Sequence, residues 1–128
     1  MINPQELRLG NLLHLYKENN LVEVIKIFEA HLEVHSVDLQ FWTEEINEFN
    51  PIPLTEEILK KCKFLNRSFY VIGAGNSFKW QLDDIVLLKN IEGKFYLPNM
   101  LKNIVLESLH QLQNLYFALT GKELEVNL

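Results

Sequence analysis

Two glutamates and two histidines alternate along one short stretch of the chain, at Glu29, His31, Glu33 and His35. In an extended strand, residues two apart share a face and lie about 6.6 Å apart, close enough for one pair to contact a metal ion. The two histidines are about 13 Å apart on a straight strand, so the four side chains cannot meet at one ion. An exposed sheet face also requires alternating polar residues. We therefore interpret the stretch as a solvated strand face and expect no metal site.

Basic and aromatic residues surround a loop that contains two glycines, Gly73–Ser77. The loop lacks a third glycine and is followed by a predicted strand rather than a helix, which excludes a dinucleotide-binding fingerprint. Nearby cations could hold a phosphate and nearby rings could stack on a base. The alternative is that the rings belong to the core and the lysines face solvent. The residues predicted to bind a nucleotide-like anion here are Arg67, Tyr70, Lys79 and Trp80.

The string from His110 to Gly121 combines amides and an imidazole with large apolar residues. On a helix, His110, Gln113, Asn114 and Phe117 form a second, mostly polar stripe beside an apolar one. The amides and the imidazole could read the polar edges of a ligand, and we include His110, Gln113 and Asn114 among the candidate ligand-binding residues. The alternative is that they tie the helix to neighbouring backbone, because buried polar groups need partners. The apolar stripe is expected to consist of Leu109, Leu112, Tyr116 and Leu119.

Residues with nucleophilic or acidic side chains form no catalytic set. None of the serines lies in a nucleophile-elbow context, and Cys62 is expected within a helix beside lysines without a histidine partner. Asp83 and Asp84 are adjacent in a predicted strand and would point to opposite faces. We therefore predict no catalytic residue, no cofactor and no enzymatic activity.

The composition indicates a folded chain of one or two closely joined subdomains. Its 128 residues are 48% hydrophobic and 11% aromatic, which is enough to build a core. No apolar run approaches the roughly 18 residues of a membrane span, and the N-terminus lacks the features of a secretory signal. A single cysteine excludes an internal disulfide and agrees with a reducing compartment. We expect a cytoplasmic protein without membrane contact. Whether it forms a homo-oligomer stays open.

Charge is distributed unevenly along the sequence. The net charge of −5 divides into −8 for residues 1–58, +5 for residues 59–102 and −2 for residues 103–128. The net negative charge argues against a general nucleic-acid-binding protein, because such binding depends on a basic surface. The basic middle could attract an anion, or it could attract the acidic ends of the same chain.

The expected fold class is α+β. Short alternating stretches with turn residues predict strands before residue 50, among them Leu21–Ile27 and Phe28–His35, arranged as a bent antiparallel sheet of the SH3-like kind. The prolines of the segment 50–53 predict a junction. We place an SH3-like subdomain at residues 1–50 and an α+β subdomain at residues 51–128.

The second subdomain is expected to contain two helices and two hairpins. Thr55 is a predicted N-cap of a short helix, and Ser108 and Gly121 are predicted to bound the main C-terminal helix. Glycine-containing turns predict two antiparallel hairpins between these helices. Their strands are expected at Phe69–Ile72 with Phe78–Leu82 and at Ile85–Leu88 with Phe95–Leu97, and a closing strand is expected at Leu124–Val126.

Three strings in matching order resemble a group of small uncharacterised proteins from bacterial viruses and mobile elements. They are LRLGNL at residues 7–12, PIPLTEEIL at residues 51–59 and HQLQNLYFALTG at residues 110–121. The resemblance implies a barrel-like start and a C-terminal helix against sheet, but it supplies no catalytic residues. It also implies an accessory protein that binds and neutralises a host component.

Two functional hypotheses follow, and a third class, a nuclease or hydrolase, would need a metal site at Glu29–His35. The first is a non-enzymatic binding protein, a counter-defence factor that sequesters a small nucleotide-like anion with the basic middle of the chain. The second is a protein–protein interaction module that binds and inhibits a host protein through the acidic N-terminal sheet.

Overall fold

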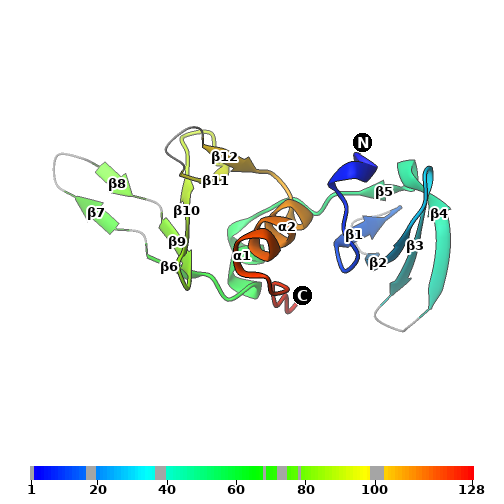
Figure 1. Ribbon diagram of the computed structural model, residues 1–128. Coiled ribbons are helices and arrows are strands. Elements are labelled where there is room, and N and C mark those ends of the chain that lie inside the picture. The colour runs from blue at the N-terminus through cyan, green and yellow to red at the C-terminus, as the bar shows by residue number, and fades with distance from the viewer. Residues whose placement is uncertain are drawn as a thin grey trace. The chain divides into compact units, whose positions relative to one another are not determined.

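The computed structural model describes residues 2–16, 20–36, 40–67, 69–71, 75–77, 79–98 and 103–128, with the backbone alone for 69–71 and 75–77. The fold is α+β, as predicted, with a curled antiparallel sheet, a second sheet and one main C-terminal helix (Figure 1). The chain forms two compact units. The first unit contains Met1–Pro53 and Ser108–Glu123, and the second unit contains Leu54–Glu107 and Leu124–Leu128.

This grouping differs from a division of the chain into residues 1–50 and 51–128. The first boundary falls after Pro53, close to the proline-marked junction. The main helix, however, belongs to the same compact unit as the N-terminal sheet. In sequence, the main part of the second unit, Leu54–Glu107, is therefore inserted between two parts of the first, and Leu124–Leu128 follows them.

The first unit has a five-stranded antiparallel sheet with the order β4-β3-β2-β1-β5. The chain curls so that β4 continues through one short 3-10 helix into β5, which pairs with β1 (Figure 1). The elements are η1 (Pro4–Glu6), β1 (Leu12–Leu15), β2 (Leu21–Ile27), β3 (His31–Ser36), β4 (Phe41–Glu45), η2 (Ile46–Glu48), β5 (Phe49–Asn50) and, after the second unit, the helix α2 (Leu109–Thr120).

A buried apolar cluster packs against this sheet, and its strand residues alternate with less buried ones, as the sequence pattern predicts. Leu32 and Val34 of β3 are fully buried, while the neighbouring Glu33 and His35 are not. The register of β2 against β3 shifts at one point, between Val24 and Lys26, and such bulges increase the bend of a sheet. The cluster consists of Ile2, Leu7, Leu13, Leu15, Val22, Val24, Leu32, Val34 and Phe49.

The third strand starts later than its alternating pattern predicts. The Phe28 N–H donates to the His31 carbonyl at 2.9 Å, so Phe28 and Glu29 belong to the turn between β2 and β3. Phe28 is exposed rather than buried. A turn at this point lets β2 pair with β3, and a pattern of alternating residues cannot show where such a turn falls.

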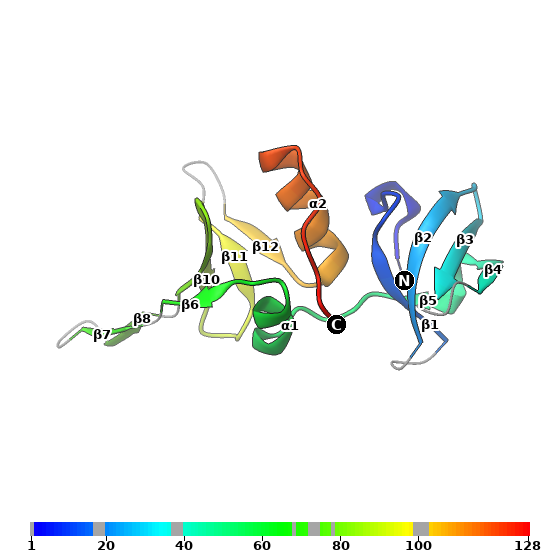
Figure 2. The same cartoon turned by 90° about the horizontal axis from the view of Figure 1, so that it is seen from below.

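The second unit contains another five-stranded antiparallel sheet, with the order β12-β11-β10-β9-β6, and a separate hairpin of β7 with β8. Strands β10, β11 and β12 can be followed in Figure 2. The elements are α1 (Glu56–Lys61), β6 (Leu65–Asn66), β7 (Phe69–Val71), β8 (Gly75–Ser77), β9 (Lys79–Leu82), β10 (Ile85–Lys89), β11 (Phe95–Leu97) and β12 (Ile104–Leu106).

One predicted hairpin of this unit is confirmed and the other is corrected. The pairing of β10 with β11 around Gly93, whose φ is 85°, agrees with the prediction. Strand β9, however, pairs with β10 through a tight turn at Asp83 and Asp84, and β7 pairs with β8 instead. Asp83 has a φ of 51°, a left-handed conformation that aspartate tolerates better than most residues. The two aspartates thus lie in a turn rather than in a strand.

Both predicted helix starts are confirmed. Thr55 caps α1 through its hydroxyl, which accepts from the Ile58 N–H at 3.2 Å. Ser108 precedes α2, its N–H donating to the Gln111 side chain at 3.2 Å, and Gly121 ends that helix with a φ of 71°. None of the helices in the described part of the chain is long and apolar enough to cross a membrane.

Two expectations for the C-terminal region are wrong. Leu119 is 54% exposed, so the apolar stripe of α2 does not continue as a buried stripe to the end of the helix. The segment 124–126 has no strand pairing, although Leu124 is buried and the Asn127 N–H donates to the Lys61 carbonyl at 2.9 Å. The spacing of apolar residues predicted both the buried stripe and the strand. It does not show whether another segment lies close enough to cover Leu119 or to pair with residues 124–126.

Candidate functional site

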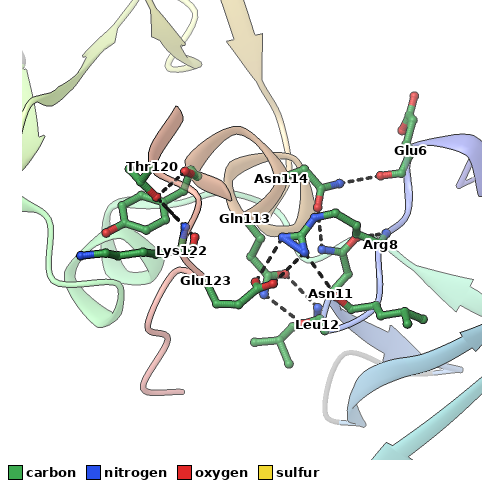
Figure 3. Close-up of polar contacts among 12 residues, drawn as sticks. Glu6, Arg8, Asn11, Leu12, Gln113, Asn114, Thr120, Lys122 and Glu123 are labelled. Carbon is green, nitrogen blue, oxygen red and sulfur yellow. Dashed lines mark hydrogen bonds and ion pairs between the residues drawn. The ribbon is translucent and has the colours of Figure 1, made fainter. Parts of the chain in front are cut away.

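The side chain of Gln113 joins α2 to the backbone at the start of β1. Its oxygen accepts from the Leu12 N–H at 2.9 Å, and its nitrogen donates to the Gly10 carbonyl at 3.1 Å (Figure 3). The side-chain amide thereby pairs with one backbone donor and one acceptor, as a neighbouring strand would. Gln113 is buried, so these two bonds replace contacts with water.

Asn114 makes a second connection to the same N-terminal segment. Its oxygen accepts from the Asn11 side-chain nitrogen at 2.8 Å, and its nitrogen donates to the Glu6 carbonyl at 2.6 Å (Figure 3). Asn11 is itself buried, and its oxygen accepts from the Arg8 N–H at 2.7 Å. The amides of the predicted polar stripe are therefore engaged with the chain's own groups, which favours the structural interpretation over ligand recognition.

Arg8 adds a charged connection to the residues that follow α2. Its guanidinium forms two bonds with the Glu123 carboxylate, at 2.7 and 3.1 Å, and its Cζ lies 4.0 Å from the centre of the Phe117 ring. The planar fork of arginine suits both a carboxylate and a ring face. We call the group of Arg8, Asn11, Gln113, Asn114 and Glu123 the helix anchor.

Ser108, His110 and Glu6 form a chain of polar groups that the sequence analysis missed. The Ser108 hydroxyl lies 3.1 Å from His110 Nδ1, and a Glu6 carboxylate oxygen lies 3.8 Å from His110 Nε2. Burial lowers the pKa of His110, and the carboxylate of Glu6 opposes that shift without cancelling it. The order of groups resembles a serine–histidine–acid triad.

Accessibility distinguishes this arrangement from a catalytic one. Ser108 is only 4% exposed and immediately precedes the first turn of α2, so its hydroxyl offers no open face to a substrate in this conformation. The thiol of Cys62 is also buried, and burial raises its pKa to about 12, far from the value an active nucleophile needs. Neither group is poised for nucleophilic attack.

The other four candidate ligand-binding residues lie in the second unit. Trp80 is 1% exposed, which favours the alternative that its ring belongs to the core, while its part in ligand binding stays a prediction. Arg67 is exposed, and its N–H donates to the Lys79 carbonyl at 2.7 Å as part of strand pairing. The side chain of Tyr70 and residues 73 and 74 of the Gly73–Ser77 loop lie outside the described residues.

Carboxylates of the second unit neutralise many of its basic residues. When the chain is counted by compact unit, this unit has eight basic and seven acidic side chains and a net charge of +1. The +5 of residues 59–102 is thus largely cancelled by acidic neighbours brought in by folding. The ion pairs are Lys63–Glu125 at 2.7 Å, Lys89–Glu56 at 2.8 Å and Lys94–Glu107 at 2.9 Å.

One of the two alternating histidines of β3, His35, contacts residues of both neighbouring strands. His35 Nε2 lies 2.6 Å from a carboxylate oxygen of Glu23 in β2, and its ring lies 6.0 Å from that of Phe41 in β4. Within the described residues, no group of three or more histidine, cysteine or acidic side chains is placed to hold a metal ion. The absence of a metal site stays a prediction.

Comparison with known proteins returned no relative: no protein-family model, no curated protein and no solved structure matches this chain.

Proposed function

We propose that the protein is a non-enzymatic, cytoplasmic binding protein of viral or mobile-element origin, and that the curled sheet of the first unit binds a host protein. Charge supports this assignment. The first unit has four basic and ten acidic side chains and a net charge of −6, against +1 for the second unit. Charge of this sign attracts a basic protein surface and repels nucleic acid.

The exposed aromatic residues of the same sheet carry the proposal. Phe28, Phe41 and Trp42 are exposed on or beside strands of the first unit, with 62% of Phe41 accessible. Aromatic side chains are enriched at protein interfaces, because they bury much area with few rotatable bonds. The large apolar residues exposed on described side chains of the second unit are aliphatic, namely Leu65, Ile91, Ile104, Val105 and Leu128.

A nucleotide-like ligand of the second unit is the weaker candidate. Three lysines of this unit are paired with carboxylates, and the ring of Trp80 is buried. We therefore expect nucleotides, cyclic or linear, to leave the melting temperature unchanged at millimolar concentration. A ligand that bound only the native state would raise it by mass action, and such a rise, lost in Arg67→Glu, would restore this candidate.

Affinity capture from host extract with cross-linking tests the host-protein proposal. Phe41→Ser and Glu45→Lys alter the exposed surface of β4, while Ile91→Ser and Glu92→Lys make the same changes at exposed positions of the second unit. We expect the first pair to lose a partner that the second pair retains. A partner that all four variants hold equally, or that only the second pair loses, would contradict the proposal.

A further inference from the structure

The outer edge of β4 is open among the described residues. This strand is the outermost in its sheet and pairs only with β3 in that part of the chain. Two backbone hydrogen bonds identify which of its groups point to β3. At one end the Ser36 N–H donates to the Gln40 carbonyl, and at the other the Ile46 N–H donates to the Ala30 carbonyl, both at 3.0 Å.

Antiparallel pairing determines the direction of the remaining groups. Hydrogen-bonded and non-hydrogen-bonded pairs alternate, and the register of β3 with β4 contains no bulge. Trp42 and Glu44 therefore bond to β3, while the N–H and C=O groups of Phe41, Thr43 and Glu45 point to the outer edge. No described residue bonds to these outward groups.

The sequence of β4 protects its open edge only in part. Such edges are commonly protected by charged side chains, above all lysine, by proline or by a bulge, and β4 reads Phe41, Trp42, Thr43, Glu44, Glu45, with two glutamates but no lysine or proline. The strand is aromatic at its first end and acidic at its last. An incoming strand would meet backbone donors and acceptors along the middle, apolar surface at one end and carboxylates at the other.

We propose that β4 accepts an extended, basic segment of the partner protein as an additional antiparallel strand. Main-chain hydrogen bonds to the outer edge would supply affinity. Lysine or arginine opposite Glu44 and Glu45, and apolar residues opposite Phe41 and Trp42, would supply specificity through cross-strand pairs. This inference rests on the proposed function and names the partner's chemistry and the mode of binding.

A second copy of this chain fits the edge less well than a basic partner. Each first unit has a net charge of −6, so pairing of two β4 strands brings like charges together. A basic segment relieves the same repulsion. The charge of the unit therefore selects the occupant.

A peptide whose centre reads lysine, lysine, threonine, valine, valine is the probe, because antiparallel pairing sets its lysines opposite the glutamates of β4. Two variants form a matched pair. Thr43→Pro removes an outward N–H without removing a bond to β3, and proline is tolerated on edge strands. Thr43→Val retains the N–H and the strand. Circular dichroism and amide spectra verify that both variants are folded.

We expect the peptide to shift the amide resonances of Phe41, Thr43 and Glu45 in the wild type and in Thr43→Val. Thr43→Pro should weaken binding by about tenfold, since at least one hydrogen bond is lost. A peptide with glutamate in place of lysine should not bind. Equal binding by Thr43→Pro, no binding to the wild type at millimolar concentration, or concentration-dependent self-association through β4 would overturn the inference.

The captured host protein separates this inference from the proposed function. If that protein binds Thr43→Pro as well as Thr43→Val but is lost in Glu45→Lys, the sheet binds it without strand addition, and only the inference fails. If Glu45→Lys and Phe41→Ser both bind the host protein as tightly as the wild type does, the proposed function fails together with the inference.

Discussion

The two units differ in the polar contacts that join distant parts of the sequence. In the first unit, the neutral amides of Gln113 and Asn114 bond to groups about 100 positions away, through three part-buried bonds and one exposed bond. In the second unit, the long-range side-chain contacts include the exposed Lys63–Glu125 pair, 62 positions apart. Both units thus have exposed ion pairs that water and salt weaken, Arg8–Glu123 in the first and Lys63–Glu125 in the second. Among the described residues, the first unit also has part-buried amide hydrogen bonds between segments about 100 positions apart.

This difference has an energetic consequence. A buried group left without its partner costs about 1–3 kcal/mol, whereas an exposed ion pair contributes about 0–1 kcal/mol. Removal of a part-buried amide bond of the first unit should therefore lower the free energy of unfolding more than removal of an exposed ion pair of the second unit. Four experiments, three of them with a control variant, can break or sharpen this comparison.

The largest effect is expected from the apolar contacts beside the helix anchor. Leu112 is 1% exposed, so Leu112→Ala should lower the free energy of unfolding by about 2–5 kcal/mol through lost burial and a new cavity. Leu119→Ala on the same helix removes an exposed side chain and should change it by less than about 0.5 kcal/mol. Chemical denaturation measures both, and equal losses would mean that the burial assigned to α2 is wrong.

Removal of an anchoring amide should have the next largest effect. Gln113→Ala leaves the Leu12 N–H and the Gly10 carbonyl without this partner, at a total cost of about 1–3 kcal/mol because both bonds are only part-buried. Gln81 of the second unit also donates to a carbonyl, that of Asp83, but at an exposed bond. Gln81→Ala should therefore cost far less. Similar unfolding free energies for the two variants would remove the distinction between the units.

Acid should destabilise the first unit through His110. Its folded pKa lies below the ordinary 6.5, so the unfolded chain binds the proton more readily, and stability falls as the pH drops from about 6.5 toward the folded pKa. Above that window the group contributes no pH dependence. Between about pH 7 and pH 5.5, the melting temperature of His110→Gln should fall less than that of the wild type. His31→Gln, at an exposed position, is the control and should keep the wild-type slope.

The smallest effect is expected at an exposed ion pair of the second unit. Lys63→Ala removes the 2.7 Å pair with Glu125, in which both side chains are more than half exposed. Its cost should be at most about 1 kcal/mol and should vanish near about 1 M salt, where the screening length is about 3 Å. Thermal melts at low and high salt measure this. A loss above that range, unchanged by salt, would make this pair comparable to the helix anchor.

Helix ends and turns that depend on only a few consecutive residues were predicted well. Thr55 and Ser108 precede helices and Gly121 ends one, because capping depends on groups within one helical turn. The turn at Gly93 is equally local. The pairing of β9 was predicted incorrectly, because a tight turn at Asp83 competed with a longer glycine-containing loop and strand propensity does not choose between them.

The candidate site was predicted less well than the elements. His110, Gln113 and Asn114 were identified from their spacing on one helix, and the structure does gather them on the same segment of the N-terminal region. Their partners Arg8 and Glu6 have no sequence signal that links them to α2. Trp80 was assigned to a ligand because a tryptophan near basic residues suits stacking, but the same ring suits a core equally well.

The sequence by itself determined the α+β class, the helix ends and the alternation of buried and exposed residues in β3, since each depends on neighbours along the chain. Only the tertiary structure decided that α2 joins the N-terminal sheet and that lysines of the middle segment meet carboxylates. It also decided that the outward groups of β4 have no partner among the described residues. The physical reason is that buried hydrogen bonds, charge pairing and open strand edges depend on which distant segments come together in the fold. The local pattern of residues does not indicate which segments these are.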